Sequence, residues 1–328
     1  MMATVPVQGN NEVTELSEHF NTMIMRLKES YESLEDKVKE RTEELVLKNA
    51  EIESTHKEIQ DSSNYAKRLQ KAILPAVSEI KEDMPDSFVY FKPKDVVSGD
   101  FYWLEEDDEN AYFSIADCTG HGIPGAFISM IGTILLNEIY NSKSLRSPDK
   151  ILDELNRLVQ LTLMSHNSQM KDGMDMSFCC LNKKTNVLQY AGANNPIWFI
   201  SKRKTVQIKV KGEWEEMLPN LEANGKYLYE LKADKQPIGK NHDEQQPFSL
   251  KHVQLEKSDC VYLFSDGYPD QFGGERTKKF SQRQFQELLT TLGSVPFEEQ
   301  EERIALAFDN WKGDNNQLDD VCVMGVKI

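Results

Sequence analysis

The run Phe113-Ser114-Ile115-Ala116-Asp117-Cys118-Thr119-Gly120-His121-Gly122 changes from an apolar strand to a glycine-rich loop at a single aspartate. A strand that ends near glycine places its last carboxylate at the rim of a sheet, where other backbone can approach closely. The same pattern recurs at Asp266, which follows the strand-like run Val261 to Ser265 and precedes Gly267. Two carboxylates are therefore expected at the rim of a β-structure.

Three further aspartates stand at comparable places. Asp100 precedes the aromatic run Phe101-Tyr102-Trp103, and Asp319 and Asp320 open the final strand-like run. Taken singly, each aspartate is better explained as a turn or capping residue. Several anionic oxygens converging on one rim repel one another unless a cation joins them, and hard oxygen ligands select Mg²⁺ or Mn²⁺. We therefore expect two or more Mn²⁺ or Mg²⁺ ions, which as a pair activate water for in-line attack on a phosphoryl group.

The order and spacing of these motifs resemble a known family. Four segments resemble the successive metal motifs of PPM-type protein phosphatases in their SpoIIE-like (RsbU-type) branch: Ser98-Gly99-Asp100, Asp117 to Gly122, Ser265-Asp266-Gly267 and Asp319-Asp320-Val321. Three more resemble the same branch: Leu69 to Pro75, Lys171 to Met176 and Ala191 to Pro196. The resemblance implies a protein serine/threonine phosphatase. It also implies an α+β fold, a β-sandwich of two antiparallel sheets flanked by helices, with the metal ions at one end.

The resemblance also implies a role for each carboxylate. A bridging ligand between two metal ions is implied at Asp117, with the backbone carbonyl of Cys118 as a further ligand. The other implied ligands are Asp100 for the second ion and Asp266 and Asp319 for the first, with Asp320 as a secondary contact beside them. The metal ions that these residues hold would activate the water.

Three residues near the motifs could serve either the reaction or only the fold. His121 could donate a proton to the leaving serine oxygen, whereas the loop that carries it could equally be a structural switch. Lys92 and Lys94 precede Asp100 and could steer a phosphate, or simply solvate the edge of a strand.

Three residues elsewhere have the same ambiguity. Asn194 and Asn195, which precede Pro196, could belong to a loop that contacts the substrate or only form a turn. Asp175 lies in an apolar neighbourhood, and the resemblance implies that it couples the metal site to regulatory helices.

The N-terminal part follows a seven-residue apolar repeat. The companion heptad position is polar between Arg41 and Ser62, and neither glycine nor proline occurs between Phe20 and Ile73. This pattern predicts one long helix in a parallel, dimeric coiled coil, ended by Pro75. The polar middle of this heptad position is suited to a helix that rotates to transmit a signal. The alternative is that the helix serves only for oligomerisation. The apolar heptad positions are Ile24, Tyr31, Val38, Leu45, Ile52, Ile59, Ala66 and Ile73.

The start of this helix resembles the end of a HAMP domain, the four-helix linker of membrane receptors, in the segment Glu12 to Met23. The protein is therefore expected to be the cytoplasmic portion of a membrane receptor, below an upstream sensor, or a soluble relative. Residues 1–15 are predicted to be disordered, or a remnant of a HAMP domain or of an expression vector. Residues 16–74 are predicted to form the signalling coiled coil, and residues 75–328 the phosphatase domain.

Downstream of Pro75, short β-rich runs alternate with helical stretches. The clearest strands are predicted at 111–116, 178–181, 197–200, 260–265 and 321–326, and helices at 125–140, 148–165, 282–291 and 297–311. The segment 202–225 is predicted to be an extended hairpin and loop, and the segment 232–247 an exposed connection.

Composition narrows the classes of function. The 328 residues include 54 acidic and 38 basic ones, and the net charge of -16 disfavours nucleic acid and anionic membranes as partners. No apolar run long enough to span a membrane and no signal-peptide pattern is present, so a cytoplasmic location is expected. Five cysteines without a CxxC pair predict buried thiols rather than disulfides or a zinc site.

These observations lead to one main hypothesis and two alternatives. The main hypothesis is a regulated phosphatase acting on a small phosphoprotein, which the resemblance implies to be an anti-sigma-factor antagonist in a partner-switching pathway. A scaffold that binds a phosphoprotein without hydrolysis is the first alternative, although no aspartate ligand is missing. A two-metal phosphodiesterase is the second, and the acidic charge and motif order oppose it. Rotation of the coiled coil would move the helices at 126–140 and 148–165, and with them the loop Asp117 to Gly122.

Overall fold

The computed structural model describes residues 5–7, 12–75, 80, 84–164, 172–210, 212–239 and 246–328. Contacts divide the chain into two units, Met1–Ser62 and Ser63–Ile328. Most of the predicted N-terminal segment 1–15 lies outside the described residues, although Glu12 to Glu15 are already helical. Lys171 and residues 240–245 of the predicted connection also lie outside them.

Helix α1 (Glu12–Ile73) is a single helix of 62 residues, as the unbroken heptad pattern predicts. Up to Ser62 its heptad residues face solvent, with Tyr31 67% and Ile52 64% exposed. Its last turns behave differently, because Ser63 and Gln70 are buried within the second unit. The helix therefore has an apolar stripe without a partner in the described chain and an end that is part of the compact unit.

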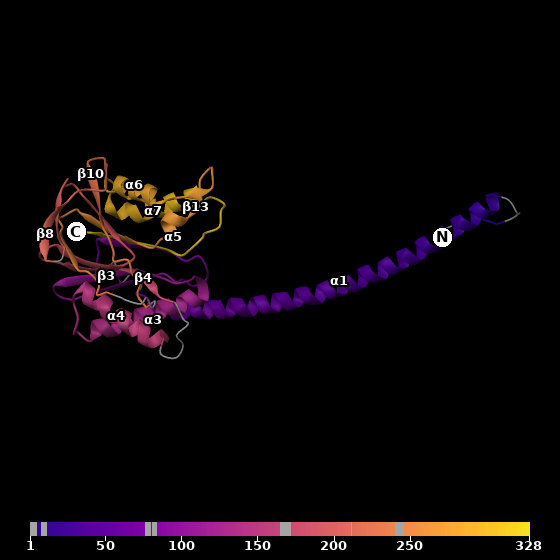
Figure 1. Ribbon diagram of the computed structural model, residues 1–328, viewed down its shortest axis with the longest axis horizontal. Helices are drawn as coiled ribbons and strands as arrows, with labels where there is room; N and C mark the ends of the chain where they lie inside the picture. Colours follow the sequence, from indigo (N-terminus) through magenta and orange to yellow (C-terminus); the bar gives the residue numbers. More distant parts are fainter. Residues whose placement is uncertain are drawn as a thin grey trace. The chain divides into compact units, whose positions relative to one another are not determined.

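The second unit is built on two antiparallel sheets between layers of helices (Figure 1). The first sheet has the order β1-β15-β12-β6-β10-β9, formed by β1 (Ser87–Lys92), β15 (Val321–Lys327), β12 (Cys260–Phe264), β6 (Ile197–Ser201), β10 (Lys226–Leu231) and β9 (Leu221–Ala223). The second has the order β2-β3-β4-β5-β11-β7-β8, formed by β2 (Phe101–Glu106), β3 (Asn110–Cys118), β4 (Met174–Asn182), β5 (Val187–Ala193), β11 (Lys251–Gln254), β7 (Val206–Val210) and β8 (Glu213–Met217). A separate small hairpin joins β13 (Phe272–Gly273) and β14 (Lys278–Lys279).

Helices cover both outer faces. The second sheet is covered by α3 (Gly122–Asn141) and α4 (Pro148–Met164), and the first by α5 (Gly267–Asp270), α6 (Gln282–Leu292) and α7 (Phe297–Lys312) (Figure 1). The alternation of side chains in each strand explains this layering. In β3, Phe113 and Ile115 enter the core between the sheets, whereas Tyr112 and Ala116 pack beneath the helices. The predicted α+β sandwich is confirmed.

The predicted elements overlap the observed ones, although the predicted helix end at residue 165 lies outside the described residues, and one expectation about a loop is wrong. All five predicted strands and all four predicted helices are present, apart from shifts of a few residues at their ends. The segment 202–225 contains β7, β8 and β9, in agreement with the predicted hairpin. The connection 232–247 is not simply exposed, because Ile238 is fully buried and forms backbone hydrogen bonds with Met174. An apolar contact beside α4 anchors this loop to β4.

Two further observations concern exposure. By length and composition α3 could cross a membrane, but half of its most apolar window is buried inside the protein, as in the core helix of a soluble domain. All five cysteines are buried free thiols, as predicted.

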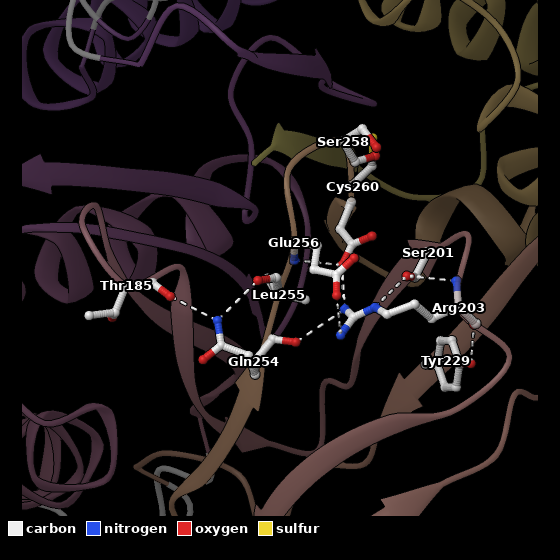
Figure 2. A network of polar contacts seen from close by, with 10 residues as sticks. Thr185, Ser201, Arg203, Tyr229, Gln254, Leu255, Glu256, Ser258 and Cys260 are labelled. Atoms are coloured by element: carbon white, nitrogen blue, oxygen red, sulfur yellow. Dashed lines mark hydrogen bonds and ion pairs between the residues drawn. The ribbon is translucent and has the colours of Figure 1, made fainter.

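A cluster of polar contacts around Arg203 fixes the C-terminal end of β6, at Ser201 (Figure 2). The guanidinium of Arg203 donates to the carboxylate of Asp259 at 2.6 Å and to the backbone carbonyl of Gln254 at 3.1 Å. Tyr229 donates its hydroxyl to the carbonyl of Arg203 at 2.6 Å. The side chain of Asp259 is only 4% exposed. The ion pair joins the segments beside β6 and β12 of the first sheet, and the hydrogen bond to Gln254 links them to β11 of the second.

Candidate metal centre

Sheet geometry places three aspartates of the second sheet together. Asp117 in β3 pairs directly with Asp175 in β4. Asp100 immediately precedes Phe101, the first residue of β2, which pairs with Ala116 of β3. Antiparallel neighbours lie about 5 Å apart. Asp100, Asp117 and Asp175 therefore lie on three adjacent strands at one end of the sandwich.

The first sheet supplies the other predicted carboxylates. Asp266 follows β12 and occupies the N-cap position of α5 without a capping hydrogen bond from its side chain, and Asp319 lies just before β15. Adjacent strands β12 and β15 are joined beyond their ends, because Ser265 donates its amide to the carbonyl of Cys322 at 2.9 Å and accepts the Cys322 amide on its hydroxyl at 3.0 Å. This contact brings the two aspartate segments to the same end of the sandwich.

Glycine allows these loops to touch through their backbones. A Cβ atom on Gly99 would lie 2.4 Å from the carbonyl oxygen of Gly120, and one on Gly125 would lie 2.1 Å from the same oxygen. A Cβ atom on Gly267 would lie 1.9 Å from the carbonyl oxygen of Asp320. The glycines in the motifs therefore serve to press the carboxylate-bearing segments together.

Asp100 is the most deeply buried of the carboxylates. The residue is 2% exposed, and its Oδ2 atom is buried without a hydrogen-bond partner. Burial raises the pKa of its carboxyl well above the usual range, a hydrogen bond from Ser265 opposes the shift, and the charges of Asp320, Asp319 and Asp266 add to it. A buried oxygen without a partner in an anionic environment is the setting that a cation would stabilise.

Asp117 and Asp266 share the same environment. Burial raises the pKa of Asp117 well above its ordinary value, and the charges of Asp100 and Asp266 raise it further. Asp266 lies at the exposed mouth of the cleft, where partial loss of hydration and then the charge of Asp270 raise its pKa. Its side chain is within hydrogen-bonding reach of Asp117. The two carboxylates are thus close enough to repel each other when both are ionised.

Asp320 has a different position from the other aspartates. Its two carboxylate oxygens accept backbone N–H groups, from Lys94 at 2.8 Å and from Gly99 at 2.7 Å. Burial raises its pKa, and these two hydrogen bonds oppose the shift. Asp319 beside it is exposed. Asp320 therefore holds the loop before Asp100 in place, while Asp319 remains accessible to a ligand.

The donor set fits Mn²⁺ or Mg²⁺. The side chains expected to bind the ions are all carboxylates, which are ligands of hard cations. Within the described ranges, no three aspartate, glutamate, histidine or cysteine side chains already form a closed metal-binding group. The carboxylates therefore lie at one end of the sandwich without forming a finished ligand shell. The residues that would hold the ions are Asp100, Asp117, Asp266 and Asp319, with the backbone carbonyl of Cys118.

Two cavities of about 260 and 180 Å³ open at this end of the sandwich, and Asp100 and Asp319 line neither of them. Both are lined by Asp117, Asp175, Asn194 and Asp266. The larger one is also lined by Thr119, Gly173, Met174 and Pro237, and the smaller one by Asn195, Pro196, Phe264, Pro269 and Gln282. We refer to the two together as the metal cleft.

The two asparagines of the β5–β6 turn make different contacts. Asn194 adopts a left-handed backbone conformation, with φ of 53°, and donates its side-chain amide to the carboxylate of Asp175 at 2.9 Å. Asn195 is buried, and donates to the carbonyl of Phe264 at 2.8 Å. Asn194 therefore lies on the wall of the metal cleft, whereas Asn195 ties the turn to the end of β12.

The basic candidates lie beside the cleft rather than in its lining. His121 begins α3, and its Nδ1 atom lies 2.8 Å from a carboxylate oxygen of Asp95. Lys92 forms an ion pair with Asp309 of α7 and lies over the ring of Phe308. Lys94 contributes its backbone amide to Asp320.

Sequence reasoning missed the role of Gln70. This residue near the end of α1 is 5% exposed, and its amide donates to the carbonyl of Ser98 at 2.6 Å and to the hydroxyl of Ser129 at 2.9 Å. Its carbonyl oxygen accepts the amide of Ser98 at 3.1 Å. A buried glutamine at the end of a heptad repeat was the available signal. Gln70 connects α1 to both α3 and the loop that carries Asp100.

A sandwich of two antiparallel sheets with aspartates converging at one end defines the PPM (PP2C-type) class of metal-dependent protein phosphatases. The family model described as Stage II sporulation protein E (SpoIIE) matches residues 107–328, more than half of the chain. The protein therefore belongs to the SpoIIE family of metal-dependent serine/threonine phosphatases. No curated protein sequence matches the chain.

Solved structures support the same assignment. The chain is similar to the SiaA-PP2C domain of Pseudomonas aeruginosa, with 27% identity, a TM-score of 0.69, and coverage of 84% of this chain and 98% of that one. The PP2C phosphatase domain and regulatory fragment of SpoIIE from Bacillus subtilis shares the fold, with 16% identity, a TM-score of 0.55, and coverage of 74% and 63%. The RsbU and RsbW domains of a Mycobacterium tuberculosis protein do so with 15% identity, a TM-score of 0.53, and coverage of 74% and 59%.

Proposed function

We propose that this protein hydrolyses phosphoserine or phosphothreonine on a regulatory protein. The observation that carries the proposal is the metal cleft, where aspartates from separate segments meet and burial raises the pKa of Asp100 and Asp117. Such an arrangement is unfavourable in the folded chain unless cations are bound. Membership of a family of metal-dependent phosphatases supplies the type of reaction.

Two Mn²⁺ or Mg²⁺ ions in this cleft would act as Lewis acids and lower the pKa of a bound water for attack on phosphorus. Residues of the protein itself hold the cleft aspartates in position. Asp320 fixes the loop before Asp100 through two backbone amides, and Asn194 fixes the carboxylate of Asp175. His121, held by Asp95, is proposed as a proton donor to the serine oxygen that leaves. Its exposed ring leaves room for a protein substrate.

We further propose that α1 regulates the reaction. Gln70 supports this proposal because it contacts Ser98, two residues before Asp100, and Ser129 in α3. A rotation of the last turns of α1 would therefore act on the metal cleft directly, in addition to the predicted path through α3 and α4. The exposed apolar stripe of α1 supports pairing with a second copy in a parallel coiled coil.

The surroundings of the protein follow from the same proposal. The resemblance of Glu12 to Met23 to a HAMP domain supports an upstream sensor or membrane receptor, with the phosphatase in the cytoplasm. An anti-sigma-factor antagonist is the proposed substrate, on the basis of the SpoIIE family resemblance. The net charge of -16 supports a protein partner over nucleic acid.

The test is hydrolysis of p-nitrophenyl phosphate and of a phosphoserine peptide, with and without Mn²⁺. Wild type is compared with Asp117→Asn, Asp266→Asn and the exposed control Asp314→Asn. Manganese-dependent turnover should fall by about 10²-fold or more in the two cleft variants, because each removes a metal-binding charge, and should be unchanged in the control.

Two results would argue against the proposal. Turnover by wild type that is independent of Mn²⁺ and Mg²⁺ would exclude metal catalysis in the cleft. Binding of the phosphopeptide without turnover at any metal concentration, both by the full-length wild type and by a variant with a stabilised coiled coil, would favour the scaffold alternative.

A further inference from the structure

The hairpin β13–β14 is built on the wall of the metal cleft. The chain leaves the cleft at Pro269 and returns to it at Gln282, and both residues line the smaller cavity. The two legs are joined at their base, because Ser281 donates its amide to the carbonyl of Pro269 at 2.7 Å and Phe280 donates to Gln271 at 2.9 Å. The hairpin therefore starts and ends beside the carboxylates without contributing to them.

Helix α7 fixes the hairpin from the other side. Gly274 donates its amide to the carbonyl of Trp311 at 2.9 Å, and the indole of Trp311 donates to the carbonyl of Gln271 at 3.0 Å. A Cβ atom on Gly273 would lie 1.8 Å from the Trp311 carbonyl oxygen. The base of the hairpin is thus held in place, and the residues beyond it project from this fixed base.

The projecting part is basic in an otherwise acidic protein. Arg276, Lys278 and Lys279 are all exposed, against one acidic residue, Glu275. Lys279 pairs with Asp270 at 2.7 Å. Arg276 and Lys278 form no ion pair within the described part of the chain, while the chain as a whole has a net charge of -16. Two unpaired cations next to the cleft are a surface that attracts acidic groups.

We propose that the hairpin β13–β14 docks acidic residues that flank the phosphorylated residue of the protein substrate. This inference rests on the proposed function and adds a substrate preference to it. The legs from Gln271 to Gly274 correspond to roughly 13 Å of extended chain at about 3.3 Å per residue. Acidic side chains roughly four residues from the phosphoserine therefore reach Arg276 and Lys278, whereas acidic residues directly beside it meet the cleft aspartates.

The test measures binding and turnover separately. Fluorescein-labelled phosphoserine peptides carry either glutamates or lysines four residues from the phosphoserine. Their dissociation constants are measured by fluorescence anisotropy with the full chain and no added metal, so that no hydrolysis occurs. The hairpin variant is Arg276→Glu/Lys278→Glu. The matched control is Lys184→Glu/Lys204→Glu, which reverses two exposed charges in the turns that follow β4 and β6.

The wild type should bind the glutamate peptide about tenfold more tightly than the lysine peptide. The ratio of the two dissociation constants, lysine peptide over glutamate peptide, should fall to unity or below in the hairpin variant and stay the same in the control. In the wild type, this ratio should decrease as the salt concentration rises from about 0.05 M to about 0.5 M. An unchanged ratio in the hairpin variant, or an equal loss in the control, would overturn the proposal. Equal binding of a single-stranded oligonucleotide of the same charge would overturn it in favour of nucleic acid.

Hydrolysis of p-nitrophenyl phosphate with Mn²⁺ separates this inference from the proposed function, because that substrate has no flanking residues. Wild type and the hairpin variant should hydrolyse it equally. Absence of turnover in wild type would count against the proposed function, while the ratio of the two peptide affinities still decides the role of the hairpin.

Discussion

Replacement of Gln70 by alanine tests whether α1 holds the metal cleft in place. The side chain makes three hydrogen bonds, two to the backbone of Ser98 and one to Ser129. The carbonyl of Ser98 keeps a second donor in Ser129 at 3.3 Å, but its amide loses its acceptor. An unsatisfied buried amide costs about 1–3 kcal/mol, and the cavity left by the side chain adds about 1 kcal/mol.

The free energy of unfolding should therefore fall by about 2–4 kcal/mol, which corresponds to a loss of roughly 5–12 °C in melting temperature for a domain of this size. The concentration of Mn²⁺ needed for half-maximal activity should rise by roughly tenfold, because the loop that carries Asp100 is no longer held. Differential scanning calorimetry and Mn²⁺ titrations measure the two effects. Gln60→Ala is the control, since Gln60 is an exposed residue of the same helix.

The reasoning would be refuted by a Gln70→Ala variant that melts within about 1 °C of the Gln60→Ala control and needs the same Mn²⁺ concentration. A variant that loses stability but keeps its metal dependence would show that Gln70 serves packing alone. Gln70→Glu separates the two halves of the contact, because an ionised carboxylate still accepts from the Ser98 amide but cannot donate to its carbonyl.

Three further perturbations test other parts of the molecule. Burial raises the pKa of Asp100 and Asp117, so these two carboxyls bind more protons in the metal-free folded state than in the unfolded chain; their contribution to stability should be greatest at low pH and be lost as the pH rises through the raised pKa values. Added Mn²⁺ should accordingly raise the melting temperature more at about pH 7.5 than at about pH 5.5, and equal shifts would contradict this. Arg203→Met leaves the nearly buried carboxylate of Asp259 unpaired, and should lower the free energy of unfolding in urea by about 2–3 kcal/mol, whereas exposed Lys202→Met should change it by less than about 0.5 kcal/mol. Arg41→Leu/Lys48→Leu extends the apolar seam of α1 by two heptads and should stabilise a dimer in sedimentation experiments and lock one activity state; unchanged activity and unchanged response to an upstream signal would remove the transmission hypothesis.

Sequence patterns could predict the fold where one face of an element is buried. The core strands β3, β6, β12 and β15 are apolar along most of their length, so their positions were evident. Strand β8 has the sequence Glu-Trp-Glu-Glu-Met and is largely exposed, so its pairing with β7 is not visible in its composition. The heptad repeat runs unbroken to Ile73, and therefore could not indicate that the last turns of α1 pack against the second unit.

The candidate site was predictable to the extent that it depends on motifs. Aspartates at the ends of strand-like runs marked the segments that the sheets bring together. The contacts of Gln70 with Ser98 and of Asp95 with His121 join residues 28 and 26 positions apart, and no periodic pattern links them. The same holds for the cleft walls at Pro237 and Gln282. Such contacts arise from the packing of loops, which the sequence specifies only through the whole fold.

The position of β15 has a consequence for the order of events during synthesis. This strand follows all the other described strands along the chain, yet it lies between β1 and β12, and Asp319 and Asp320 directly precede it. At about 5–20 residues per second, the chain beyond α1 takes roughly 12–50 s to be made. During that interval α1 has already been synthesised, while the first sheet is still incomplete. The proposed pairing of α1 with a second copy can therefore form before the sheet that precedes Asp266 and follows Asp319 is complete.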